Sequence, residues 1–279
     1  MTNNLSLKNL VWPSTGKHAI DVMALAVEWS HPLKADELIS IAQSARKNET
    51  LMAFLPTEKR FPGFEVKIEE QAASVVSSNV EIVDFIQNSP DGHQTWALSL
   101  RPEFFSCACS LYTRWAEIKP QTLKILKTVA SAVNTSNSKI KAFGLQYSDT
   151  FKCKKEDGLL LNELIRKNSS IIPSSALRRK SLWHSHNGWY SNCESGHRVL
   201  NIFNIELVED NELLILKING QHRIQAIEFQ TGTNKELELD SIETFADQLH
   251  IENKLALQNL LSDYALELIN FSKVEEANE

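Results

Sequence analysis

The chain has 279 residues, of which 42% are hydrophobic and 23% are charged, and its formal net charge is −6. This apolar content is enough to bury a full core, in one large domain or in two coupled ones. The acidic balance argues against a general nucleic-acid-binding protein, because such proteins gain affinity by neutralising phosphates. No apolar run approaches the roughly 20 residues that cross a bilayer, and residues 1–18 lack the apolar core of a secretion signal. We therefore expect a cytoplasmic protein with no membrane attachment, whose four cysteines stay reduced.

The first half of the chain alternates between strand and helix patterns. Residues 20–29 form a mostly apolar run that suits a buried strand, and Leu38, Ile41 and Ala42 recur at helical spacing within 34–47. The other elements predicted here are an extended stretch that begins at 51–55, strands at 64–68, 81–86, 95–100, 104–111 and 139–151, and a long helix at 112–133.

The second half repeats the theme of a sheet followed by long helices. Its predicted elements are a short helix at 158–167, strands at 188–192, 199–208 and 213–229, and one long helix or a pair at 242–269. Turn signals stand at 209–212 and at Asn219-Gly220. The predicted fold class is α+β, with two consecutive sheet-plus-helix halves at 1–155 and 156–279 that are closely coupled or form one domain. We expect mainly antiparallel strands with long helices packed on one face.

Several short motifs carry a family resemblance. They are Pro13 before an apolar strand and a helix, Tyr112-x-x-Trp115 at the head of the long helix, Gly144-Leu145-x-Tyr147 in a strand, and Asp247-x-Leu249-His250 near the end. In these motifs the chain resembles a sporadically distributed family of uncharacterised prokaryotic proteins of similar length. The resemblance covers nearly the whole chain and implies a shared fold.

The chain also departs from that family. Ala142 and Gln146 stand where the relatives carry Arg, and Asp149 stands where Asn is common. A function carried by those Arg residues would not transfer to this chain. The patchy occurrence of the family is typical of genes on mobile islands, so the resemblance implies an accessory role such as phage defence.

The sharpest chemical constellation is a group of histidines and a cysteine, namely His184, His186, Cys193 and His197. Imidazole and thiolate groups suit zinc, and four of them could complete a tetrahedral shell. The spacing matches no established zinc motif, so ordinary fold residues remain the more economical interpretation. If zinc is bound, the chain could be a metal-assisted hydrolase or nuclease.

Aromatic residues are interleaved with this constellation. Trp183, Trp189 and Tyr190 are typical of a partly exposed surface that binds a partner or a polar, aromatic ligand. The segment before them, 166–180, is basic and ends in Arg178, Arg179 and Lys180, which could hold an anion or a nucleic-acid phosphate. These six residues form the predicted binding surface, although a solvated face is the simpler interpretation of the basic residues.

Asp247 and His250 lie three positions apart on a predicted helix, so their side chains can meet on one face. A carboxylate that orients an imidazole is how a general base is built. No nucleophile motif accompanies them, and we interpret them as a structural polar pair or a helix–sheet anchor. Tyr147, beside Gly144, is expected to make a buried hydrogen bond through its phenol.

Together these patterns predict a non-catalytic binding or assembly subunit. A protein partner or self-association is the expected interaction, and an anionic ligand or nucleic acid at 166–180 is an alternative. The competing hypothesis is the zinc-dependent enzyme built on His184, His186, Cys193 and His197.

Overall fold

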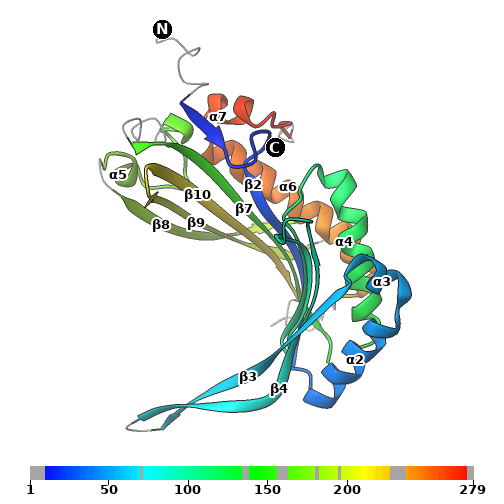
Figure 1. The fold of residues 1–279 in the computed structure, drawn as a ribbon. Coiled ribbons are helices and arrows are strands. Elements are labelled where there is room, and N and C mark those ends of the chain that lie inside the picture. The colour runs from blue at the N-terminus through cyan, green and yellow to red at the C-terminus, as the bar shows by residue number, and fades with distance from the viewer. Residues whose placement is uncertain are drawn as a thin grey trace. The chain divides into compact units, whose positions relative to one another are not determined.

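The computed structural model describes residues 10–69, 72–133, 138–155, 163–179, 182–193, 196–226 and 237–274, with the backbone alone described for 63–81. The strands are β1 (Val11–Pro13), β2 (Ile20–Trp29), β3 (Thr57–Glu69), β4 (Ala72–Asn88), β5 (Gln94–Leu100), β6 (Phe104–Cys109), β7 (Ile140–Lys154), β8 (Trp183–Asn192), β9 (Arg198–Asp210) and β10 (Leu213–Gln225). The helices are α2 (Ala35–Lys47), α3 (Glu49–Phe54), α4 (Trp115–Ala130), α5 (Ser174–Leu177), α6 (Ile242–Leu260) and α7 (Asp263–Leu268), and Figure 1 shows their course.

Within the described residues, ten strands form one sheet in the order β3-β4-β5-β6-β2-β7-β10-β9-β8, and β1 pairs with β7. The registers that the structure gives are antiparallel throughout. The α+β class with antiparallel strands is therefore confirmed. In the part of the chain that the structure describes, no helix has the length and apolar character needed to cross a membrane.

The chain divides into two compact units that are built from separate segments. Unit 1 comprises 1–23, 145–224 and 247–279, and unit 2 comprises 24–144 and 225–246. Strands β2, β7 and β10 and helix α6 each contribute residues to both units. The boundary expected after residue 155 falls inside unit 1, so the two units alternate along the chain.

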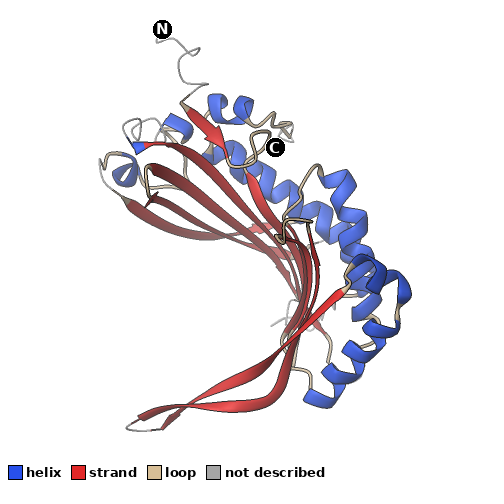
Figure 2. Cartoon of the chain, viewed as in Figure 1, coloured by secondary structure: helices blue, strands red, loops and turns tan. Residues whose placement is uncertain are grey.

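In unit 2 the helices α2, α3 and α4 lie on one face of the strands (Figure 2). Helix α2 begins where the Glu37 carboxylate accepts a hydrogen bond from the Lys34 backbone N–H at 2.9 Å, which satisfies one of the open donors of the first turn. The extended stretch expected at 51–55 was wrong, because the chain forms α3 there. The Asn48 side chain caps this short helix by accepting from the Leu51 N–H, and its six residues were too few to show a helical period.

Unit 1 carries the strands β8, β9 and β10, whose side chains alternate between a buried inner face and an outer face. The turn expected at Asn219-Gly220 was wrong, since β10 continues through it and Gly220 pairs with Phe203 of β9. A Cβ atom at Gly220 would lie only 3.0 Å from Asn253 Oδ1 and from Phe203 Cζ. Glycine is therefore required here for close packing and not for a turn.

The end of the chain forms two helices, α6 and α7, one of the two outcomes that the sequence left open. The Ser262 side chain caps α7 by accepting from the Ala265 N–H, which separates it from α6. Residues 158–162 of the short helix expected at 158–167 and residues 227–229 of the strand expected at 213–229 lie outside the described residues.

Candidate binding site

The inner faces of β9 and β10 are apolar except for Asn201 and His222, which lie in one row across the strands. The register places Trp189 of β8 opposite Asn201 of β9, and Asn201 opposite His222 of β10. Asn201 and His222 are 0% and 1% exposed, and Asn253 of α6, 4% exposed, lies above them. A buried polar group without partners is costly, so this row must be hydrogen-bonded.

The buried polar groups form a chain of contacts between the sheet and α6. His222 Nδ1 lies 2.7 Å from Asn201 Oδ1, and His222 Nε2 lies 3.0 Å from Asn253 Oδ1. The Asn201 amide nitrogen donates in turn to Ser191 Oγ at 3.0 Å. We call these four residues, together with Glu252, the polar network.

Glu252 is the end of the polar network that carries a carboxylate. Its Oε2 accepts a hydrogen bond from Ser191 Oγ at 2.7 Å and a longer one from the Asn201 amide nitrogen at 3.4 Å. Its Oε1 accepts no hydrogen bond from the described residues. The network therefore fixes the position of the carboxylate and leaves one oxygen available.

The imidazole of His222 is neutral near pH 7. Burial lowers its pKa to about 4, and the contact with Asn253 opposes that change only in part. Both ring nitrogens face amide oxygens, and a neutral ring can donate to only one of them. His222 is therefore a buried, uncharged side chain that connects the sheet to α6.

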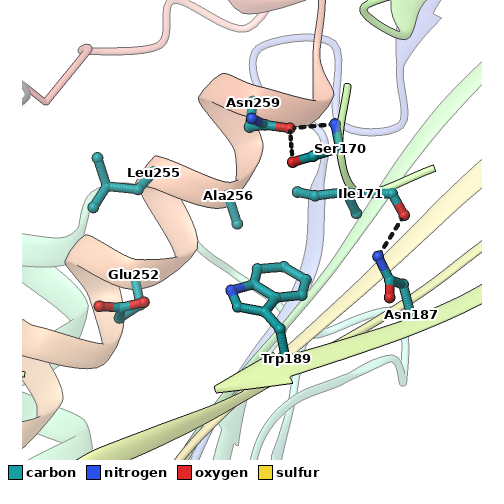
Figure 3. Close-up of a pocket in the computed structure, with 8 residues that line it drawn as sticks. All are labelled: Ser170, Ile171, Asn187, Trp189, Glu252, Leu255, Ala256 and Asn259. Carbon is teal, nitrogen blue, oxygen red and sulfur yellow. Dashed lines mark hydrogen bonds between the residues drawn. The ribbon is translucent and has the colours of Figure 1, made fainter. Parts of the chain in front are cut away.

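A cavity of about 410 Å³ opens beside the polar network, between α6 and β8. Figure 3 shows Trp189 rising from β8 towards Ala256 of α6. The lining residues are Ser170, Ile171, Asn187, Trp189, Glu252, Leu255, Ala256 and Asn259. Its size is within the range of about 300–1,000 Å³ of small-molecule sites, and its mixture of apolar walls with a few polar groups is typical of them.

The segment 169–171 closes one side of the cavity and is held at both ends. Asn259 Oδ1 accepts hydrogen bonds from the Ser170 N–H at 3.0 Å and from Ser170 Oγ at 3.1 Å, and Asn187 Nδ2 donates to the Ile171 carbonyl at 2.9 Å (Figure 3). These bonds tie the segment to both α6 and β8. The cavity is therefore a preformed feature of unit 1.

The aromatic wall of the cavity is set by packing in the sheet. Trp189 stacks on Phe203 with ring centroids 5.7 Å apart and an interplanar angle of 18°. Phe203 itself contacts His222 edge-on at 5.6 Å and occupies the space that Gly220 leaves. The indole is thereby held in one orientation at the wall.

The structure distributes the four residues of the candidate zinc site over two places. His184 and His186 lie on the outer face of β8, where His186 Nδ1 contacts Asn204 Oδ1. Cys193 and His197 lie in the turn between β8 and β9, where Cys193 Sγ lies 3.0 Å from the His197 carbonyl oxygen. At about 3.3 Å per residue, His186 is about 20 Å from the end of β8 at Asn192, too far for the four to share one ion. Among the described residues, no three His, Cys, Asp or Glu side chains are grouped as metal ligands.

The predicted binding surface is also divided. Trp183 is buried in the core of unit 1, Trp189 lines the cavity, and Tyr190 is 62% exposed on the opposite face of β8. Arg178 and Arg179 are exposed after α5, and Lys180 lies outside the described residues. Of these six residues, only Trp189 belongs to the cavity.

Within the basic segment 166–180, Arg166 has a structural role. Its guanidinium donates to the Leu261 carbonyl at 3.3 Å and lies 3.4 Å from Asp263 Oδ1. Arg166, one of the cations expected to attract an anion, therefore binds groups at the end of α6 and the start of α7.

Asp247 and His250 lie on the α6 segment of unit 1. His250 Nδ1 contacts the hydroxyl of Tyr147 at 3.0 Å, and Tyr147 is fully buried in β7. This contact joins α6 to the sheet through the phenol of the Gly-Leu-x-Tyr strand.

Glu252, Asn201, His222 and Asn253 were not singled out from the sequence. Asn201 and His222 stand in the apolar phase of two alternating strands, a signal that marks an inward polar side chain. The sequence did not show that these positions face each other, because the register between β9 and β10 is a tertiary property.

Comparisons with known proteins assign no family. No protein-family model matches the chain, and no curated protein matches it. Among solved structures, the di-domain ARO/CYC BexL from the BE-7585A biosynthetic pathway aligns over 91% of this chain and 99% of its own, with 8% identity and a TM-score of 0.16.

Proposed function

We propose that this chain is a non-catalytic binding subunit whose ligand site is the cavity between α6 and β8. The observation that carries the proposal is a preformed cavity of about 410 Å³ with an immobilised carboxylate on one wall and a stacked indole on another. Such a cavity suits a small molecule, or one side chain that a protein partner presents.

The polar groups at the cavity favour binding over chemistry. The Ser191 hydroxyl donates to Glu252 and is not among the residues that line the cavity. The lining hydroxyl of Ser170 is bonded to Asn259, and no base among the described residues contacts it. Nucleophilic catalysis needs a base within hydrogen-bond reach of an accessible nucleophile.

The experiment is a ligand-observed NMR screen with a mixed set of cationic, neutral and anionic fragments. The Ala256→Phe protein, whose cavity is filled, is compared with the wild type. We expect a subset of fragments to bind the wild type and to lose binding in Ala256→Phe. Ile251→Phe is the matched control, since Ile251 is exposed on the same helix and does not line the cavity.

A second variant distinguishes a filled cavity from a misfolded protein as the cause of lost binding. Ala256 is buried, so Ala256→Phe could disturb the packing of α6. Leu255→Trp narrows the cavity from a half-buried position, and thermal unfolding shows whether each variant is folded. The proposal is wrong if no fragment distinguishes the wild type from both cavity variants.

A further inference from the structure

The cavity has the electrostatic character of a site for a cation. Glu252 is the one ionisable side chain among the lining residues. In the described part of the chain it accepts bonds from Ser191 and Asn201 and makes no ion pair with Lys, Arg or His. A carboxylate that is fixed by neutral donors keeps its full charge for a ligand.

Two acceptor oxygens of the lining are open to a ligand, while the Trp189 indole N–H and the Asn259 Nδ2 group are donors. Glu252 Oε1 and Asn187 Oδ1 accept no hydrogen bond from the described residues, whereas Asn187 Nδ2 is engaged with the Ile171 carbonyl. A ligand group that binds at the Glu252 carboxylate must supply a donor. An ammonium group supplies three donors and a positive charge.

The apolar walls define the rest of the ligand. Ile171, Leu255 and Ala256 supply aliphatic surface, and Trp189 supplies an indole, the side chain that attracts cations most strongly through its π system. An alkyl chain that extends from the ammonium group would bury its methylene groups against these walls.

We propose that this cavity binds a primary alkylammonium group, with its charge at Glu252 and its alkyl chain against Trp189. This inference rests on the proposed binding function and names the ligand class for the same site. The charge of this ligand is opposite to that of the anionic ligand that the sequence left as an alternative for the basic segment 166–180. The ammonium group belongs either to a free amine or to a lysine side chain of a partner.

The test uses three probes of equal length, n-butylamine, n-butanol and butyrate, titrated into the protein near pH 7.5 by calorimetry or ligand-observed NMR. We expect the amine to bind at least about tenfold more tightly than the alcohol, as a charge-assisted hydrogen bond predicts. Butyrate is expected to bind more weakly than the alcohol. Glu252→Gln should remove the preference for the amine and leave the affinity for n-butanol unchanged.

Matched variants keep the result interpretable. Glu243→Gln changes an exposed carboxylate on the same helix and should leave amine binding intact. If Glu252→Gln does not fold, Leu255→Lys tests the same idea, because its own ammonium group would compete for Glu252 and abolish amine binding. Equal affinities for amine and alcohol, or tighter binding of butyrate, would overturn the ammonium assignment while fragment binding in the cavity still stood.

The source of the ammonium group is resolved by a fourth probe, Nα-acetyl-lysine methylamide. Binding comparable to that of n-butylamine assigns the site to a lysine side chain of a partner, since the cavity then admits a peptide backbone at its mouth. Binding of n-butylamine alone assigns it to a free amine. If none of the four probes binds and the fragment screen is also blank, the proposed function fails together with the ligand class.

Discussion

Replacing Asp149 by Asn should stabilise unit 1 at pH 8 and leave its stability nearly unchanged below pH 4. Asp149 lies in β7 and is 3% exposed. Burial, and next the negative charge of Asp21, raise its pKa from the ordinary 3.8 to about 7. Asparagine has nearly the same shape and carries no charge at any pH.

The sign and size of the effect follow from the two pKa values of Asp149. In the unfolded chain the carboxyl ionises above pH 3.8, whereas in the folded chain it keeps its proton up to about pH 7. Its contribution to stability is therefore fully present below pH 3.8 and is lost as the pH rises through 7. The difference of about 3 in pKa corresponds to about 4 kcal/mol at 1.36 kcal/mol for each pKa unit, which is an upper limit for the gain in Asp149→Asn at pH 8.

His222 has the opposite dependence in the same pH range. Its pKa falls from 6.5 to about 4 on burial, so its contribution to stability is present above pH 6.5 and is lost as the pH falls through 4. Between about pH 4 and 6.5 the stability contributions of the two residues change in opposite directions with pH and partly cancel in the wild type. The informative quantity is therefore the difference between Asp149→Asn and the wild type at each pH.

Hydrogen exchange of peptides from β9, which lies wholly in unit 1, measures this difference at pH 5, 6, 7 and 8. Comparison at equal pH cancels the intrinsic exchange rate, and 4 kcal/mol corresponds to roughly a thousandfold slower exchange. Asp210→Asn, at an exposed position of unit 1, is the control and should show no pH-dependent gain. An equal difference at pH 5 and pH 8 would refute the assignment of a protonated Asp149 in the folded protein.

Three further predictions concern packing, hydrogen bonding and thiol reactivity. Gly220→Ala should lower the stability of unit 1 by about 1–3 kcal/mol in the same exchange assay, because its Cβ would meet atoms at 3.0 Å. Gly188→Ala should lower the stability of unit 1 by less, because the nearest atom to its Cβ would lie at 3.4 Å. Tyr147→Phe should lower the free energy of unfolding by about 1 kcal/mol, because the contact with His250 is lost. An unchanged free energy of unfolding would show that this contact does not stabilise the protein. A brief pulse of iodoacetamide should alkylate Cys193 first, as peptide mass spectrometry can show, since the other three cysteines are buried.

Local patterns predicted many of the elements. The apolar run at 20–29 has the bounds of β2, and the helical spacing of Leu38, Ile41 and Ala42 marks the buried face of α2. Both signals depend on a period that one element repeats along its own length. Elements of this kind can be read from a sequence because no distant residue is needed to define them.

The candidate site could not be predicted in the same way. The sequence drew attention to Trp189 but grouped it with Trp183 and Tyr190 as one surface. Successive residues of a strand point to opposite faces, so Trp189 lines the cavity while its neighbours lie on the outer face. The partner of Trp189 across the cavity, Glu252, comes from a helix 63 positions further along the chain, and no local pattern connects the two.

The order of the segments along the chain determines when each strand can pair during synthesis. Val11 of β1 pairs with Cys153 of β7, 142 positions later, so at about 5–20 residues per second the first strand waits roughly 7–30 s for its partner. The segment 24–144, which makes up most of unit 2, is complete before that pairing is possible. Glu252 and Asn253 emerge later still, after all the strands of the sheet. A nascent chain that ends before α6 therefore exposes the inner faces of β8, β9 and β10. A chaperone would have the largest apolar surface to bind during this interval.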